Sequence, residues 1–276
     1  MSARYLAWIL MLAIAAPARA QEPPLHTADP VPLPHGALAI ELGADLLMDV
    51  AFPLSGLSGD LVRAPSVGLR LGLGGIGEFQ ASTGWNHLFI DARGPGPFAD
   101  QVNVDGDVTR DAEDPVVATK IRLREETARW PATGFRAATR LPSAGQESGL
   151  GNDAMDFLFS ILAGKTVGTT RLLANAGLGI LSAPLRGDRQ NDVLVYGVSA
   201  SRPLDDRWTL LGEIHGRRDL RGDTPPGTED HDLVRLGAGW SRAPLVLYGA
   251  FVAGLNDHDP DFGASVGITW TRQAYP

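Results

Sequence analysis

Hydrophobic and polar positions alternate most clearly over residues 155–180. Between 155 and 161 every second residue is large and apolar, and the same period resumes between 172 and 180. A period of two on both sides of a Gly-containing turn predicts a β-hairpin with one apolar face. The other face of this hairpin carries polar side chains, among them Asp156, Arg171 and Asn175.

Similar strand patterns follow one another along the chain without a convincing amphipathic helix. We predict twelve strands, over residues 37–50, 64–73, 77–90, 114–124, 131–141, 153–164, 169–181, 192–202, 208–217, 231–241, 245–254 and 262–272. The intervening connections alternate between long and short, as in 51–63 followed by 74–76 and 91–113 followed by 125–130. Outer-membrane barrels have an even strand number, tight periplasmic turns and longer outer loops. The pattern predicts an all-β, antiparallel transmembrane barrel; a soluble β-sandwich or lipocalin-like barrel is the alternative.

The tryptophans give an independent indication of the same topology. Trp130, Trp208, Trp240 and Trp270 all lie beside predicted short turns or near the C-terminus. An even strand number places those turns and the C-terminus at one end of a barrel. We therefore predict that these four residues form an aromatic girdle at the inner membrane interface.

The N-terminus is typical of an exported protein. Residues 1–20 combine a positive start, a short apolar run and an A-x-A site, which predicts a signal peptide cleaved after Ala20. Residues 21–36 are Pro-rich, so we expect an extended tail outside the folded core, followed by the barrel over 37–276. The predicted location is the bacterial outer membrane, with its lipid as a partner.

Composition excludes several classes of function. The chain contains no Cys, so disulfides, thiolate metal sites and Cys nucleophiles are absent. Its formal net charge of −8 gives no electrostatic footprint for binding nucleic acid. We expect no cofactor.

Three short motifs resemble known sites but lie in the wrong context. "GLGGIG" (72–77) fits a nucleotide-binding pattern, yet no helix follows it and we predict a hairpin turn. "GASVG" (263–267) fits a nucleophile elbow, but its serine lies in an alternating strand. "QVNVDGDVTRDAE" (101–113) approaches a calcium loop with misplaced ligands, so we interpret it as an acidic outer loop.

Acidic and histidine residues gather in two predicted outer loops, "EDHD" (229–232) and "NDHD" (256–259). His with Asp can bind a metal ion or act as acid and base. Solvated loop charges explain these residues more simply, because Asp and Asn are common in turns. We therefore predict neither a metal site nor an enzyme.

The inward faces of the predicted strands carry many charged side chains. We predict that the following residues line the lumen: Arg70, Glu78, Lys120, Arg122, Arg136, Arg140, Asp156, Arg171, Glu213, His215 and Arg235. Lys120, Arg122, Arg136 and Arg140 should form a basic stripe on neighbouring strands. These charged residues either fill the interior as a network of ion pairs or line a permeation path. The sequence supports both alternatives equally, because a barrel of twelve strands is intermediate between filled eight-stranded barrels and open porins.

Most of the mature chain resembles a known family of outer-membrane transporter barrels, named after the phenol meta-cleavage degradation pathway. The resembling features are Lys120 in "DPVVATKIRL", "LPS" (141–143), "GLGN" (149–152), Asp156 and the early hairpin "GLRLGLGGIGEFQASTGW" (68–85). The resemblance implies a barrel that moves small, often hydrophobic, molecules across the outer membrane, and it carries over no catalytic residue. The C-terminal "TWTRQAYP" departs from the terminal Phe usual in such barrels.

Together these patterns predict a passive channel or transporter for an unidentified small molecule. An outer-membrane hydrolase is one alternative, and it needs a catalytic constellation that the sequence does not show. A closed barrel with a structural or adhesive role is the other.

Overall fold

The computed structural model describes residues 25–182, 185, 190–220 and 224–276. The predicted signal peptide therefore lies outside the described residues. The strands are β1 Ala37–Phe52, β2 Leu57–Leu73, β3 Gly77–Arg93, β4 Val108–Ala112, β5 Val116–Arg124, β6 Ala132–Arg140, β7 Asp156–Val167, β8 Thr170–Ser182, β9 Gln190–Pro203, β10 Trp208–Asp219, β11 His231–Arg242, β12 Leu245–Gly254 and β13 Phe262–Gln273. Two single-turn 3-10 helices, η1 Ala99–Gln101 and η2 Gln146–Ser148, lie in connections. No helix among the described residues is long and apolar enough to cross a membrane.

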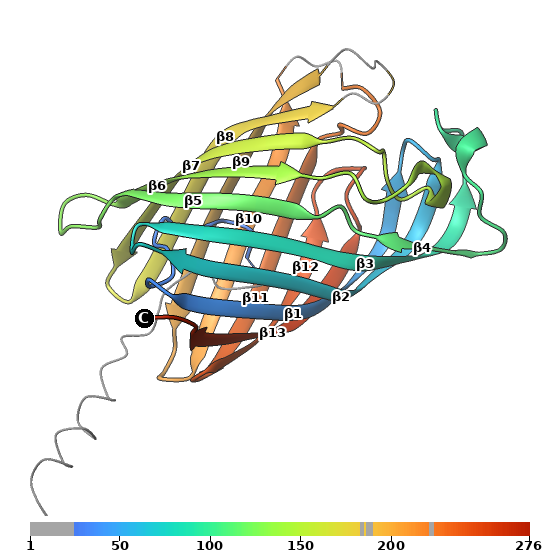
Figure 1. Cartoon of the computed structure of the whole chain (residues 1–276). Helices are drawn as coiled ribbons and strands as arrows, with labels where there is room; N and C mark the ends of the chain where they lie inside the picture. Colours follow the sequence, from blue (N-terminus) through green and yellow to red (C-terminus); the bar gives the residue numbers. More distant parts are fainter. Residues whose placement is uncertain (1–24, 183–184, 186–189, 221–223) are drawn as a thin grey trace, which may run out of the picture.

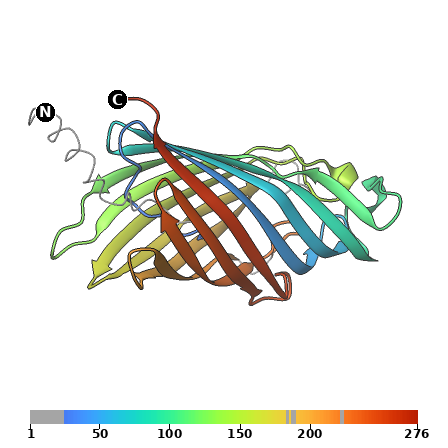
Figure 2. The same cartoon turned by 90° about the horizontal axis from the view of Figure 1, so that it is seen from below.

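All strands belong to one antiparallel sheet that closes on itself. β1 pairs with the full length of β13, from Ala37 opposite Gln273 to Met48 opposite Phe262. Figure 2 shows the last strand lying beside the first strands. Closure satisfies the backbone groups that an open sheet would leave exposed at its edges.

The barrel has twelve strand positions, and two short strands share one of them. β5 pairs with the first part of β3, over Gly77–Ser82. β4 pairs with the later part of the same strand, over Trp85–Phe89. The predicted all-β, antiparallel barrel is therefore confirmed, with one of its twelve positions interrupted between residues 112 and 116.

Apolar and polar side chains separate onto the two faces of the sheet. In β7, Phe157 and Ile161 are 40% and 56% exposed on the outside, whereas Asp156 and Leu162 are 2% and 0% exposed. Successive residues of a strand point to opposite faces, so this separation follows directly from the alternation in the sequence. Other large apolar residues exposed on the outside include Leu42, Leu69, Leu178, Val198, Ile214, Leu236, Leu247, Phe251 and Val266. Apolar exposure on this scale marks a surface that is covered by something other than water.

Short connections lie at the end of the barrel where the C-terminus lies (Figure 1). They comprise residues 74–76, 125–131, 168–169, 204–207 and 243–244. Gly74 and Gly75 have φ of +59° and +75°, which L side chains rarely adopt, so "GLGGIG" forms a hairpin turn as predicted. Asp205 accepts hydrogen bonds from the backbone N–H groups of Trp208 and Arg207, both at 2.7 Å, and these bonds hold the pKa of the Asp205 carboxyl below its usual value.

The opposite end differs from the prediction at residues 51–63. These residues were expected to form a long loop, but β1 and β2 continue through most of them and only 53–56 connect the two strands. β1, β2 and β3 are the longest strands of the barrel, and β4 adds to the outer part of β3 (Figure 1). The backbone pairing between β1 and β2 continues across two register shifts, which break the simple alternation in this stretch.

The four tryptophans predicted for a girdle lie at the short-turn end. Trp208 and Trp240 are directly opposite one another on β10 and β11. Trp270 pairs with Leu245, next to the turn at 243–244. Trp130 is half exposed in the 125–131 connection and packs under Arg124 at 5.1 Å. Their role at a membrane interface stays a prediction.

Candidate functional site

The Pro-rich segment of residues 25–36 lies inside the barrel. This position corrects the expectation of a tail outside the folded core. Leu25, Thr27, Ala28, Asp29 and Leu33 are all buried. A Pro-rich chain has few N–H groups to offer a sheet, but it can lie extended across an inner wall whose side chains bind its backbone.

The first contact of this segment is with β10. The Glu213 carboxylate accepts hydrogen bonds from the backbone N–H groups of His26, at 2.9 Å, and Thr27. The His26 ring stacks on that of His215, with ring centres 4.6 Å apart and planes inclined by 6°. His215 Nε2 also lies 3.9 Å from Glu213. Glu213 and His215 thus face inward as predicted, and they fix the start of the segment.

The middle of the segment binds β8. Asp29 forms a two-pronged ion pair with Arg171, in which Nε and one terminal nitrogen of the guanidinium lie 2.9 and 2.8 Å from the two carboxylate oxygens. Arg171 also binds Glu126, from the 125–131 connection, at 2.6 Å. The Asn175 amide, oriented to satisfy its neighbours, accepts from the Ala28 N–H at 2.6 Å and donates to the Ala28 carbonyl at 3.0 Å.

The end of the segment covers an ion pair between β3 and β5. Lys120 Nζ lies 3.1 Å from Glu78 Oε1, and both side chains are completely buried. Lys120 also donates to the Val31 carbonyl at 3.1 Å, and Glu78 accepts from the Leu33 N–H at 2.7 Å. The segment therefore crosses the inner wall from β10 to β3, near the short-turn end of the barrel.

The predicted basic stripe exists, although most of its members have partners. Lys120 and Arg136 are directly opposite one another on β5 and β6. Arg122 binds Glu125 at 2.9 Å and the Gly75 carbonyl at 3.2 Å. Arg140 pairs with Asp156 and lies 3.4 Å from Asp114. The stripe is thus largely a network of ion pairs.

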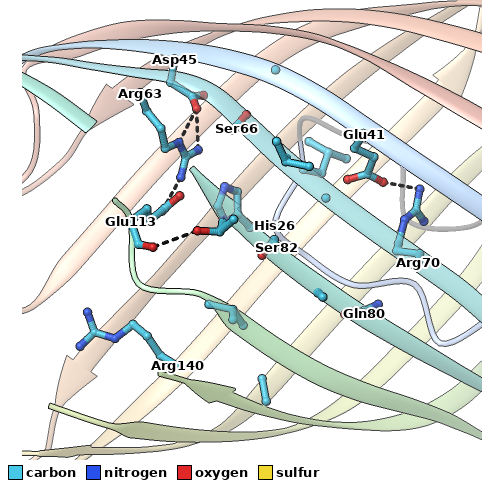
Figure 3. A pocket seen from close by; sticks show the side chains of 18 of the residues that line it. His26, Glu41, Asp45, Arg63, Ser66, Arg70, Gln80, Ser82, Glu113 and Arg140 are labelled. Atoms are coloured by element: carbon cyan, nitrogen blue, oxygen red, sulfur yellow. Dashed lines mark hydrogen bonds and ion pairs between the residues drawn. The ribbon is translucent and has the colours of Figure 1, made fainter. Parts of the chain in front are cut away.

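A second chain of charges crosses β1 and β2, which neighbour the stripe on the other side of β3 (Figure 3). Arg63 lies between Asp45, at 2.7 Å from its Nε, and Glu113, at 2.8 Å. Arg70 pairs with Glu41 at 2.6 Å. Sequence reasoning missed Arg63 and Glu113, because both fell in predicted loops. Only the continuation of the strand pairing beyond the expected ends reveals them.

The serine of the "GASVG" motif belongs to this charge network. Ser265 is buried in β13, where its hydroxyl binds Asp45 and accepts a hydrogen bond from Arg235 at 3.3 Å. A nucleophilic serine needs an adjacent general base, and neither of these groups is a histidine. The motif therefore marks a packed lumen position, and Arg235 lies buried there as predicted.

Among the cavities formed by the described residues, two lie in the lumen. The larger has a volume of about 510 Å³ and lies against β1, β2 and β3, with Arg140 and His26 also lining it (Figure 3). The smaller, of about 310 Å³, lies between the N-terminal segment and β7–β11. Both volumes fall in the range of pockets that bind small molecules.

The acidic and histidine-rich outer loops pack against each other. His231 Nδ1 lies 2.7 Å from an Asp259 oxygen, and the other oxygen accepts the Asp232 N–H at 2.9 Å. Asn256 donates to Asp232 at 2.8 Å. Within the described residues, no group of three His, Cys, Asp or Glu side chains is arranged to hold a metal ion. These contacts join the start of β11 to the loop that follows β12.

No protein-family model matches the chain, and no curated protein matches it. The resemblance to the phenol-degradation transporter family therefore stays a prediction. Among solved structures, the COG4313 outer membrane channel from Pseudomonas putida F1 is 12% identical, with a TM-score of 0.61, and the match covers 91% of this chain and 100% of that one.

Two further structures are more distant. The translocator domain of the autotransporter NalP from Neisseria meningitidis is 14% identical, with 85% and 88% of the two chains covered and a TM-score of 0.47. The Ralstonia pickettii toluene transporter TbuX is 10% identical, with 88% and 90% covered and a TM-score of 0.44. Since all identities are low, the comparison with the COG4313 channel shows that the chain shares the fold of an outer-membrane barrel.

Proposed function

We propose that this protein is a channel for small solutes in the bacterial outer membrane. The outward apolar side chains would contact lipid, and the closed sheet would leave no backbone group unpaired in hydrocarbon. The fold shared with an outer membrane channel supports this assignment.

The observation that carries the proposal is the pair of cavities inside the barrel, whose linings mix charged and apolar side chains. Their volumes of about 510 and 310 Å³ leave room for water and small molecules despite the N-terminal segment. A barrel filled by packed side chains would have no such space. The segment narrows the lumen, so the solutes are small, and the charged walls favour polar solutes over hydrocarbons.

The interior offers less support for the other functions. Ser265, the serine of the G-x-S-x-G motif, is bound to Asp45 and Arg235, which gives a hydrolase no activated nucleophile there. A closed structural barrel would hold the segment of residues 25–36 equally well. A measurement of ion current distinguishes a closed structural barrel, which carries none, from a channel.

The test uses the purified protein, refolded and inserted into planar lipid bilayers. A channel gives discrete current steps and a reversal potential that shifts in a salt gradient. The heat-unfolded protein serves as the control for membrane leakage. A folded, inserted barrel that shows no current steps would overturn the proposal.

A further inference from the structure

Two lumen arginines, Arg136 and Arg217, differ in their partners from five other basic residues of the inner wall. Arg136 Nε donates to the side-chain oxygen of Gln80 at 2.9 Å, and Arg217 Nε donates to the Glu229 carbonyl at 2.8 Å. Both acceptors are uncharged. By contrast, the following residues of the inner wall each form an ion pair with a carboxylate: Arg63, Arg70, Lys120, Arg140 and Arg171.

Neither Arg136 nor Arg217 forms an ion pair with a carboxylate in the described part of the chain. Gln80, the partner of Arg136, donates in turn to Glu78 at 2.6 Å, but that carboxylate already pairs with Lys120. The two guanidinium groups therefore keep positive charge that no carboxylate of the described residues contacts directly, although Glu78 acts on Arg136, and Glu229, Asp156 and Asp230 act on Arg217, from beyond ion-pair distance. In a partly enclosed site such charge attracts anions more strongly than it would in open water.

The same two arginines lie where the two cavities meet. Five residues line both cavities: His26, Arg136, Leu158, Val195 and Arg217. We call this set the neck. It brings together two cationic side chains, two aliphatic side chains and a ring of the N-terminal segment. His26 is held there by its stacking on His215.

We propose that the neck is a binding site for small organic acids, in which Arg136 and Arg217 bind the carboxylate and Leu158 and Val195 contact the apolar body. This inference deepens the proposed function and rests on it for its physiological role. Arginine donors match a carboxylate geometrically, and hydrogen bonds between charged partners are about twice as strong as neutral ones. Inorganic anions would use the arginines but gain nothing from the aliphatic side chains.

Equilibrium binding tests the site without requiring conduction. Benzoate is titrated into the refolded protein in detergent and followed by calorimetry, with benzyl alcohol as a neutral probe of similar shape. We expect saturable binding of one benzoate per barrel and at least tenfold weaker binding of benzyl alcohol. The variants Arg136→Gln and Arg217→Gln should each weaken benzoate binding about tenfold or more, whereas Arg110→Gln removes the same charge from the exposed part of β4 and should leave it unchanged.

A second variant keeps the test decisive if an arginine replacement prevents folding. Leu158→Trp fills the neck without changing its charge, and it should also weaken benzoate binding. If inorganic phosphate binds as tightly as benzoate, the organic-acid assignment is wrong. The assignment is also wrong if the Arg136→Gln variant binds benzoate as tightly as the unsubstituted protein. A barrel that binds benzoate but carries no current would refute the channel and leave the site standing. A conducting barrel without saturable benzoate binding would refute the site alone.

Discussion

Lys120 and Glu78 form an ion pair of 3.1 Å with both side chains completely buried, and each also binds the backbone of the N-terminal segment. The pair joins β3 to β5 across the register position where these two residues are opposite. Lys120 also donates to the Val31 carbonyl, and Glu78 also accepts from the Leu33 N–H and from the Gln80 amide. The same two residues therefore close the barrel wall and hold the segment that narrows the lumen.

Breaking this ion pair from either side should destabilise the barrel strongly. Glu78→Gln leaves the Lys120 charge buried without a counterion, and Lys120→Met leaves the Glu78 charge in the same position, so each should cost about 3–5 kcal/mol. The double variant should cost less than the sum, with a coupling of about 1–3 kcal/mol. Denaturant unfolding of the refolded proteins measures all three. If the double variant loses as much free energy of unfolding as the two single variants together, Lys120 and Glu78 do not stabilise the barrel as a pair.

Arg136 and Arg140 lie on the same face of β6 but should respond differently to replacement by Gln. Arg140→Gln leaves Asp156 and Asp114 without their cation, so the free energy of unfolding should fall by about 2 kcal/mol or more. Arg136→Gln loses a hydrogen bond to a neutral amide and should cost about 1 kcal/mol. Thermal melting compares the two. A larger loss for Arg136→Gln would contradict the assignment of partners.

The outward face of the hairpin formed by β7 and β8 should tolerate charge poorly in a bilayer. Leu178→Arg places a guanidinium among outward apolar side chains and should cost about 2–4 kcal/mol near the middle of the membrane. Ser160→Glu, on the lumen side of the same hairpin, should cost much less because Ser160 lines the smaller cavity and is directly opposite Arg136. Refolding into lipid vesicles under a denaturant titration measures both. Equal costs would show that this hairpin does not face lipid.

The short turns should face the periplasm and the longer connections the cell exterior. The chain has no Cys, so single Cys substitutions at Asp205 and Thr224 provide a clean comparison. A membrane-impermeant thiol reagent applied to intact cells should label position 224 and not position 205. Labelling at 205 alone would reverse the orientation.

Much of the barrel could be predicted because one physical rule, the alternation of inward and outward side chains, acts on neighbouring residues. That rule placed Phe157 outside and Asp156 inside, and it found most strands. It failed at 51–63, where register shifts break the period although the backbone pairing continues. It also gave no sign of β4, whose pairing with β3 joins residues separated by a connection.

The interior was harder to predict because its contacts join residues far apart in the sequence. Asp29 meets Arg171 on the inner wall although the two are far apart in the sequence, and a Pro-rich segment has no periodicity that would reveal which wall it covers. Inward orientation of Arg136 and Arg140 follows from the alternation, but their different partners do not. Those depend on which side chains from β3 and β7 reach each guanidinium, and the sequence carries no local signal for that.

The most direct test of the account asks whether current passes through the neck. Val195 lines both cavities, whereas Val198 on the same strand is 60% exposed on the outside of the barrel. We predict that a bulky, charged thiol reagent reduces the single-channel current of Val195→Cys by more than half and leaves Val198→Cys unchanged. Mass spectrometry confirms that each thiol has reacted. An unaltered current after complete modification at position 195 would contradict conduction through the lumen.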